Sequence, residues 1–150
     1  MKTLYLMRHG KSSWDFPGLT DRERPLLDKG IERTEKRARE LKETGVKLEA
    51  IWTSDAVRAM QTAEIVRNIF DLPEESVFVE PLIYDAEHVN DLRRVVLSVP
   101  DEFETMLLVG HNPLITELAR IFTRNLLDEM STSQIVAAEM AAQDAGIRAK

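Results

Sequence analysis

Two arginines and two histidines stand where they could together bind a tetrahedral anion. Arg8 and His9 directly follow an apolar run near the start of the chain, and His111 follows a second such run. Arg58 falls in the first turn of a predicted helix. A guanidinium fork binds phosphate oxygens, and a helix N-terminus attracts anions through its unpaired N–H groups. These residue types therefore favour a phosphate-binding cage.

The elements that must position these residues alternate between short apolar runs and longer helical patterns, an order typical of an α/β sheet. The predicted strands are Thr3–Met7, Glu49–Thr53, Val77–Val79, Met106–Val109 and, more weakly, Gln134–Glu139. In an open α/β sheet, ligands bind beyond the carboxyl ends of the strands. We therefore expect His9 and His111 to be neighbours in space and the sheet to be mostly parallel.

Apolar spacing and capping residues predict helices over residues 27–44, 54–70, 88–98 and from 112 onward. Gly45 is placed to end the first helix in a left-handed conformation. Ser54 or Asp55 is the predicted N-cap of the second. Asn112 and Pro113 are predicted to start the last helix, Asn112 by accepting from free amides and Pro113 as the first helical residue. The alanine-rich C-terminal segment is expected to be frayed or helical.

The segment Lys11–Gly18 has no periodicity and contains proline and glycine, which indicates a loop. Loops beside strand ends commonly carry function. Lys11 and Ser12 are candidates for contact with phosphate. Trp14 and Phe16 would either line a substrate entrance or pack the loop.

Composition limits the class of protein. With 150 residues, 43% of them hydrophobic, the chain is expected to form one domain, 1–150. The net charge of −6 is distributed over mixed segments, which disfavours nucleic acid as a partner. Cysteine is absent, and no apolar stretch approaches the ~20 residues that span a bilayer. We expect a cytoplasmic protein with no membrane partner; the sequence does not indicate its oligomeric state.

Three segments carry a family resemblance: LMRHG at 6–10, TSDAVRAMQTAE at 53–64 and VGHNP at 109–113. In order and spacing they resemble the signature segments of the histidine phosphatase superfamily, in its phosphoglycerate-mutase-like branch. The small size and the segment around Tyr84 are most similar to SixA-type phosphohistidine phosphatases. The resemblance implies a three-layer α/β/α sandwich with a mostly parallel sheet, and a single histidine phosphatase domain over residues 1–150.

The resemblance also implies a covalent mechanism in which His9 attacks phosphorus and forms a phosphohistidine that water hydrolyses. Arg8, Arg58 and His111 would bind the three non-bridging oxygens. No cofactor or metal is implied, because the cage supplies the positive charge. To present a lone pair, His9 should donate its other ring N–H to a backbone carbonyl near Gly10. The protonation of His111 is left open.

One departure from the family pattern bears on the substrate. Larger members carry a glutamate that protonates the leaving oxygen, and Tyr84 stands at that position here, where we expect it to be partly buried. Asp85 and Glu87 are nearby, so the general acid could be either residue or none. A P–N bond has imidazole as leaving group, which needs a strong acid less than an alkoxide does. The expected partner is therefore a phosphorylated protein carrying phosphohistidine.

Other interpretations remain open. The chain could be a phosphatase for a small phosphorylated substrate, or a non-catalytic module that recognises phosphate. A mutase is disfavoured because the chain lacks the longer segments that enclose a bisphosphate. A zinc site is disfavoured because no carboxylate accompanies His9 and His111 at matching positions, and two arginines would repel the ion.

Overall fold

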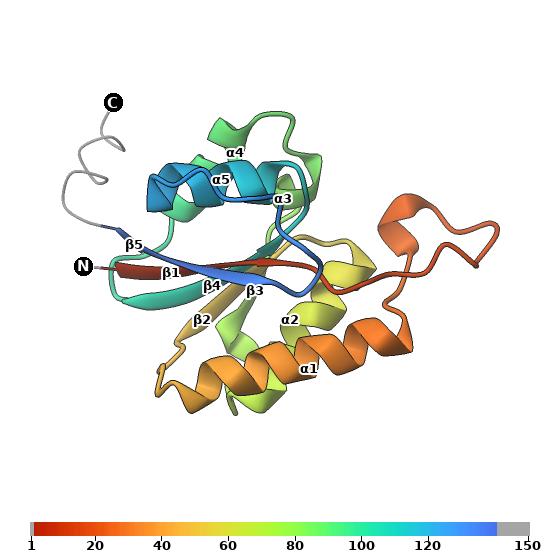
Figure 1. Ribbon diagram of the computed structural model, residues 1–150, viewed down its shortest axis with the longest axis horizontal. Coiled ribbons are helices and arrows are strands. Elements are labelled where there is room, and N and C mark those ends of the chain that lie inside the picture. The colour runs from red at the N-terminus through yellow and green to blue at the C-terminus, as the bar shows by residue number, and fades with distance from the viewer. Residues whose placement is uncertain (1, 141–150) are drawn as a thin grey trace.

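The strands of the central sheet are apolar on both faces because helices cover each of them (Figure 1). The computed structural model describes residues 2–140. Its strands are β1 (Lys2–Arg8), β2 (Ala50–Thr53), β3 (Val77–Val79), β4 (Thr105–Gly110) and β5 (Ile135–Met140). Its helices are α1 (Asp28–Glu43), α2 (Val57–Ile69), α3 (Leu82–Asp85), α4 (Val89–Leu97) and α5 (Leu114–Thr123), with short 3-10 turns η1 (Asp21–Glu23) and η2 (Glu74–Ser76).

The five strands lie in the order β3-β2-β4-β1-β5. The first four are parallel to one another, and β5 pairs with β1 in the antiparallel direction at one edge. The predicted α/β class with a mostly parallel sheet is therefore confirmed. The weakly predicted last strand also exists, one residue later than expected at each end.

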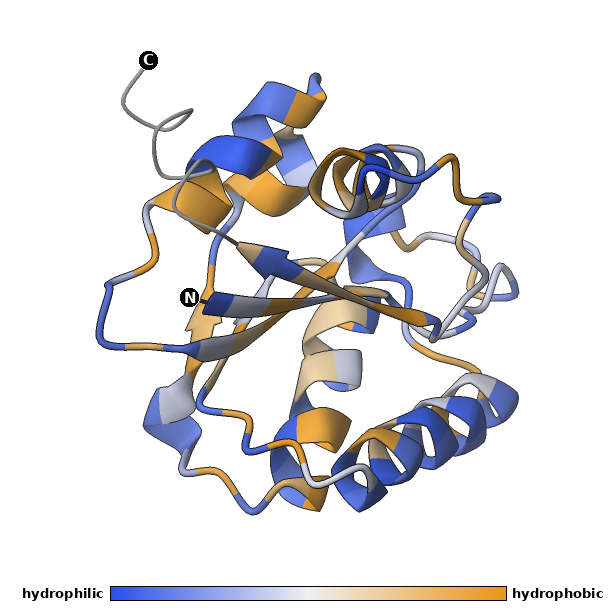
Figure 2. Ribbon diagram, turned by 60° about the vertical axis from the view of Figure 1, so that its left-hand side comes forward, coloured by the Kyte–Doolittle hydropathy of each residue, from blue (hydrophilic) through white to orange (hydrophobic). Residues whose placement is uncertain are grey.

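Two apolar cores lie on opposite sides of the sheet, and alternate residues of each strand supply them. In β1, Leu4 and Leu6 pack with α4 and α5, whereas Tyr5 and Met7 pack with α1 and α2. Figure 2 shows the matching pattern on the helices, whose hydrophobic residues face the sheet and whose charged residues face outward. This is the three-layer α/β/α arrangement that the sequence resemblance implied.

The connections make β1 and β4 a topological switch point. They are adjacent parallel strands, with Arg8 in register with Gly110. The chain leaves β1 toward α1 on one face and leaves β4 toward α5 on the other (Figure 1). A crevice opens where neighbouring strands send their chains to opposite faces. His9 and His111 therefore emerge side by side at this crevice.

The expected helix starts are partly wrong. α2 begins at Val57 with Ala56 as its N-cap, because the Ser54 and Asp55 side chains have partners elsewhere. α5 begins at Leu114 with Pro113 as N-cap rather than as first helical residue. Asn112 does not cap the helix.

Both the oxygen and the nitrogen of the Asn112 side-chain amide form hydrogen bonds. It accepts from the Thr116 hydroxyl and donates to the Met130 carbonyl, which ties the start of α5 to the segment before β5. Gly45, in contrast, follows α1 with φ of +92°, so the predicted left-handed stop is confirmed.

The sequence analysis did not predict three short elements, α3, η1 and η2, because they are too short to show a periodic pattern. The prediction for the alanine-rich segment falls on residues 141–150 and lies outside the described residues. Within residues 2–140, no helix has the length and hydropathy needed to cross a bilayer.

Candidate active site

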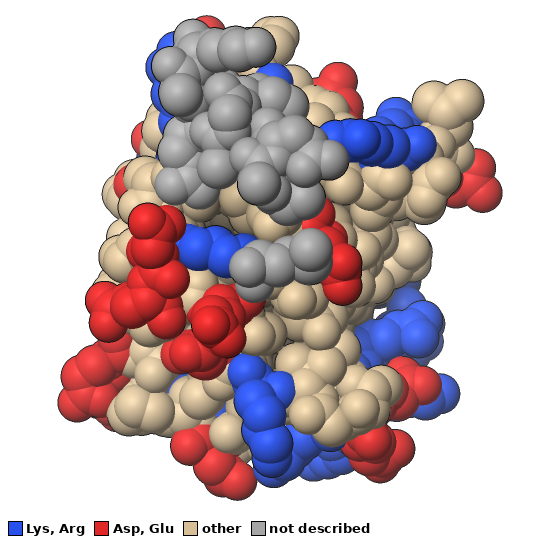
Figure 3. Space-filling model, turned by 90° about the vertical axis from the view of Figure 1, so that its left-hand side faces the viewer, with Lys and Arg blue, Asp and Glu red and all other residues tan. Residues whose placement is uncertain are grey.

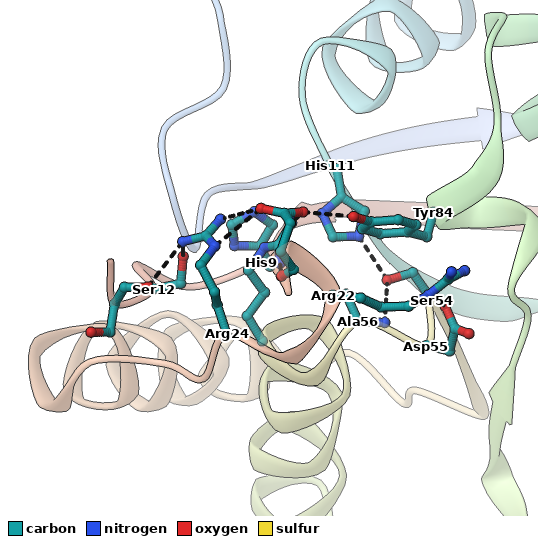
Figure 4. Close-up of polar contacts among 12 residues, drawn as sticks. His9, Ser12, Arg22, Arg24, Ser54, Asp55, Ala56, Tyr84 and His111 are labelled. Atoms are coloured by element: carbon teal, nitrogen blue, oxygen red, sulfur yellow. Dashed lines mark hydrogen bonds and ion pairs between the residues drawn. The ribbon is translucent and has the colours of Figure 1, made fainter. Parts of the chain in front are cut away.

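The four residues singled out in the sequence line one pocket. Arg8, His9, Arg58 and His111 surround an open cavity of about 370 Å³ at the carboxyl end of the sheet. The ring centroids of His9 and His111 are 5.0 Å apart, and Figure 4 shows the two imidazoles side by side. The predicted proximity of the two histidines is confirmed, although they are about a hundred residues apart in the chain.

His9 lies directly after β1 and is 8% exposed. Its Nδ1 lies 2.7 Å from the carbonyl oxygen of Gly10, and because a carbonyl only accepts, Nδ1 carries the proton. Nε2 is left with a free lone pair. Burial lowers the pKa of His9 to about 4, the hydrogen bond to Gly10 opposes this, and the nearby guanidinium of Arg58 adds to the lowering. The imidazole is therefore neutral at pH 7.

The backbone after His9 is held by close packing. The Gly10 N–H donates to the Thr62 hydroxyl at 3.0 Å, which ties the loop to α2. A Cβ at Gly10 would lie 2.7 Å from the Thr34 hydroxyl, and one at Gly30 would lie 2.2 Å from the Lys11 carbonyl. Both positions therefore require glycine so that α1 and the loop can approach each other.

Arg58 is 5% exposed and is held by the loop before α1. Its Nη1 donates to the Asp21 carbonyl at 2.6 Å, and its Nη2 donates to the Asp21 carboxylate at 2.9 Å. Arg8 is held from the other side, by donation of Nη1 to the Met130 carbonyl at 3.0 Å. The terminal nitrogens thus fix both guanidiniums in place.

Three buried nitrogens in this pocket have no hydrogen-bond partner: Nε of Arg8, Nε of Arg58 and Nδ1 of His111. Within residues 2–140, only one other buried side-chain atom is in this state, Nε of Arg93. Buried polar groups are usually paired, so three unpaired ones on residues around one cavity favour a bound ligand there. An anion with several oxygens, such as phosphate, fits this set of nitrogens.

His111 is oriented by a residue outside the pocket. Its Nε2 lies 2.7 Å from the hydroxyl oxygen of Ser54. Burial lowers the pKa of His111 to about 3, and the neighbouring His9 and Arg58 lower it further in the same direction. The imidazole that the sequence left undecided is therefore neutral at pH 7 in the unliganded protein.

Asp21 is a central residue that the sequence analysis missed. Its carboxylate accepts from Arg58, from Arg24 at 2.9 and 3.0 Å, and from the Tyr84 hydroxyl at 2.7 Å. Burial would raise the pKa of Asp21, but the hydrogen bonds from Tyr84, Arg24 and Arg58 outweigh it and hold the pKa well below its ordinary value. The run Asp21-Arg22-Glu23-Arg24 resembles a solvated charged segment, so nothing in it marked one residue.

Arg24 lies beside the cage and was also missed. It donates to the Ser12 hydroxyl at 2.8 Å and stacks beneath the Trp14 ring, with its Cζ 3.5 Å from the ring centroid. Lys11, Ser12 and Trp14 line the same pocket. Trp14 is 78% exposed and lines the pocket, and its ring also packs against Arg24, so it borders the cavity and packs within the loop at the same time.

The candidates for a general acid lie on the α3 side of the pocket. Tyr84 is partly buried, as expected. Its hydroxyl donates a hydrogen bond to the Asp21 carboxylate, which raises the pKa of the phenol. Asp85 forms an ion pair with Arg22 at 3.1 Å. Glu87 lines a smaller cavity of about 200 Å³ that also borders Tyr84 and His111.

The pocket is basic although the chain carries a net charge of −6. Its lining includes Arg8, Lys11, Arg24 and Arg58. Figure 3 shows the opposite end of the molecule, where acidic side chains gather along one side of the face. Among the described residues, no three His, Asp or Glu side chains are grouped closely enough to hold a metal ion. The local charge therefore favours an anion.

Comparisons with known proteins point to the same chemistry. The model of the histidine phosphatase superfamily (branch 1) matches residues 4–78, half of the 150 residues. An uncharacterized chloroplast protein of Arabidopsis thaliana is 32% identical over 119 residues, which are 74% of this chain. The chain spans only about half (54%) of that relative's length.

SixA is similar in both sequence and structure. The phosphohistidine phosphatase SixA of Escherichia coli is 27% identical over 135 residues, covering 89% of this chain and 82% of SixA. The solved structure of the protein histidine phosphatase SixA with tungstate superimposes with a TM-score of 0.83 and 26% identity, covering 95% of this chain and 90% of that one. The fold, the match to the family model and the likeness to SixA together establish that this chain belongs to the histidine phosphatase superfamily, branch 1.

Proposed function

We propose that this protein is a phosphatase that uses His9 as nucleophile and removes the phosphoryl group from phosphohistidine on a protein. The observation that carries the proposal is the set of three unpartnered buried nitrogens on residues that line one cavity together with His9, whose Nε2 is free. Three nitrogens correspond to the three non-bridging oxygens of a phosphoryl group. In this assignment Arg8, Arg58 and His111 bind those oxygens, and His9 attacks the phosphorus.

In the first step, the Nε2 lone pair of His9 forms a bond to phosphorus as the bond from phosphorus to the substrate nitrogen breaks. The electron pair of the broken bond stays on the substrate imidazole. That imidazole leaves as a neutral ring when its other nitrogen carries a proton. On the enzyme, Nδ1–H remains bonded to the Gly10 carbonyl, which stabilises the positive charge that phosphorylation places on the ring.

In the second step, water attacks phosphorus and the bond to Nε2 breaks. The electron pair returns to the ring, so His9 regains its neutral form with Nδ1 still protonated. The proton of the attacking water goes to the released phosphate. The cage nitrogens hold the oxygens throughout, and they need no rearrangement as charge moves between the attacking and leaving atoms.

A phosphohistidine substrate suits the α3 side of the pocket. The Tyr84 hydroxyl donates a hydrogen bond to Asp21, and the carboxylate of Asp85 is paired with Arg22, so neither group is free to protonate an alkoxide. Protonation of a leaving imidazole takes place on its far nitrogen rather than on the atom bonded to phosphorus. The site therefore does not need an acid next to the bridging atom. Trp14, which lines the pocket and is exposed, offers surface to a protein substrate, and Phe16 two residues further along the loop is exposed as well.

The test is a substrate panel read with a nucleophile variant. Wild type and His9→Ala are compared on a phosphohistidine peptide, an aryl phosphate and an alkyl phosphate. We expect turnover in the order peptide, aryl, alkyl, and loss of all of it in the variant, with the fold retained by circular dichroism. Undiminished turnover by His9→Ala would reject the assignment of the nucleophile.

The same panel separates the other interpretations. Faster turnover of the alkyl phosphate would favour a small phosphorylated substrate. Tight phosphate binding without any burst of product on the first turnover would favour a recognition module. A phosphoenzyme that decays in acid and survives alkali would support the P–N intermediate.

A further inference from the structure

A buried hydroxyl contacts His111 on the edge of the ring that faces away from the cage. Ser54 follows β2 and is 0% exposed, and its Oγ lies 2.7 Å from Nε2 of His111. Figure 4 shows this contact on one side of the ring and the other ring nitrogen pointing toward His9. The hydroxyl therefore touches neither the pocket nor any group that would bind there.

The direction of this hydrogen bond follows from the partners of the hydroxyl. The backbone N–H of Ala56 donates to Oγ of Ser54 at 3.3 Å, so the oxygen already accepts one hydrogen bond. If Nε2 of His111 also donated, the hydroxyl proton of a fully buried serine would have no acceptor among its contacts in the described chain. If Nε2 accepts instead, each of these groups is satisfied. The hydroxyl thus donates to Nε2.

We propose that Ser54 is a positioning residue that holds His111 in the neutral tautomer with the proton on Nδ1, so that Nδ1–H donates to a phosphoryl oxygen. The part of this inference that concerns phosphate rests on the proposed function. The part that concerns the tautomer does not. With the opposite tautomer, a nitrogen lone pair would face the oxygens and repel them.

The arrangement makes the two histidines complementary. Both carry their proton on Nδ1. In His9 this N–H donates to the Gly10 carbonyl, and the lone pair of Nε2 is free to attack phosphorus. His111 turns Nε2 to Ser54 and offers its proton to the cavity. One imidazole is thereby set as a nucleophile and the other as a hydrogen-bond donor, and both are uncharged.

The charges around His111 explain why a hydroxyl fits here better than a carboxylate. The ionisable groups around it are Arg8, His9, Asp21, Arg58, Tyr84 and Glu87. Two of these are permanent cations that a charged imidazolium would repel. A carboxylate at residue 54 would favour the imidazolium, whereas a hydroxyl orients the ring without adding charge.

The direct test is the protonation of His111 in wild-type protein labelled with 15N-histidine, measured by NMR at pH 7 without ligand and then with inorganic phosphate. We expect a protonated Nδ1 and an unprotonated Nε2 for His111, and a shift of the Nδ1 proton when phosphate is added. A proton on Nε2, or on both nitrogens, in the unliganded protein would overturn the inference. Wild type that shows the expected tautomer without turnover would reject only the proposed function.

Variants add a functional measurement. Ser54→Ala should lose the single tautomer and lower kcat on phosphohistidine peptide by about tenfold or more, less than the roughly 10²–10³-fold cost of removing an oxyanion donor outright. Ser54→Thr keeps a hydroxyl and should recover most of the rate and the tautomer. Thr53→Val is the matched control, because the only hydrogen bond of this neighbouring buried hydroxyl among the described residues is to the Ser54 backbone carbonyl. Full activity and an unchanged tautomer in Ser54→Ala would overturn the inference.

Discussion

Lowering the pH from 7 to 5 should destabilise the folded protein through His9 and His111, the two buried histidines of the pocket. The pKa of His9 is lowered to about 4 and that of His111 to about 3, in both cases mainly by burial. In the unfolded chain a histidine has a pKa near 6.5. Between these values the unfolded state binds more protons than the folded state, so the free energy of unfolding falls as the pH falls below about 6.5.

The size of the effect follows from the same pKa values. At pH 5.5 a histidine of pKa about 6.5 is roughly nine-tenths protonated and one of pKa about 4 is hardly protonated, a difference of about 0.9 proton. Each histidine then contributes a slope of about 1.2 kcal/mol per pH unit, and the two together about 2.4. From pH 7 to pH 5 the protein should lose roughly 3–4 kcal/mol of unfolding free energy through these two residues.

Urea unfolding followed by circular dichroism at half-unit pH steps measures this slope. His9→Gln and His111→Gln should each reduce it by about half, and the double variant should be nearly flat over this range. Asp21, whose pKa is lowered in the fold, begins to lose its contribution only as the pH falls below about 5, toward the ordinary carboxyl pKa, so it does not obscure the window. A wild-type slope near zero would refute the view that both imidazoles are buried in their neutral form.

Three further predictions concern the surroundings of the cage. Asp21→Asn should lower the free energy of unfolding by about 2 kcal/mol, because it leaves the buried Arg58 guanidinium without its anion, and the partial exposure of Asp21 keeps this cost moderate. Glu23→Gln should cost much less, because among the described residues the Glu23 carboxylate bonds only to Thr20. Tyr84→Phe keeps the ring and removes the hydroxyl, and kcat on phosphohistidine peptide should change by less than about threefold. A decrease in kcat near 10²-fold would instead identify the phenol as a general acid. Gly30→Ala should destabilise the fold by about 1–3 kcal/mol and impair turnover, because its Cβ would clash with the Lys11 backbone beside the cage. An unchanged urea midpoint would show that α1 can move away from the Lys11 loop at no cost in stability.

The sequence alone predicted that Arg8, His9, Arg58 and His111 lie together, because each of them belongs to a local pattern. Arg8 and His9 lie at the end of one strand, His111 follows another, and Arg58 lies in the first turn of the helix after a third. Once the alternation of strands and helices indicated a parallel sheet, the rule that strands deliver their carboxyl ends to one edge placed them together. The acceptor for the Nδ1 proton of His9, expected near Gly10, is the Gly10 carbonyl itself.

The capping residues were interpreted less successfully, for a physical reason. Ser54 and Asn112 have the side chains of helix caps, and propensity alone favours that role. In the folded protein each has a partner from a distant segment: Ser54 contacts His111, and Asn112 contacts Met130. A local preference worth about 1 kcal/mol gives way when tertiary contacts offer stronger or more numerous hydrogen bonds.

Residue order and periodicity by themselves determined the fold class, the strand ends and the four residues of the cage, because those features depend on contacts within a few residues or on the general geometry of parallel sheets. Only the tertiary structure decided the charge state of both imidazoles, the clamp that Asp21 forms with Arg24, Arg58 and Tyr84, and the contact of Ser54 with His111. These depend on burial and, apart from the contact of Asp21 with Arg24, on contacts between residues 37 to 63 positions apart. No local pattern encodes such distances, since they arise when the helices and loops pack around the sheet.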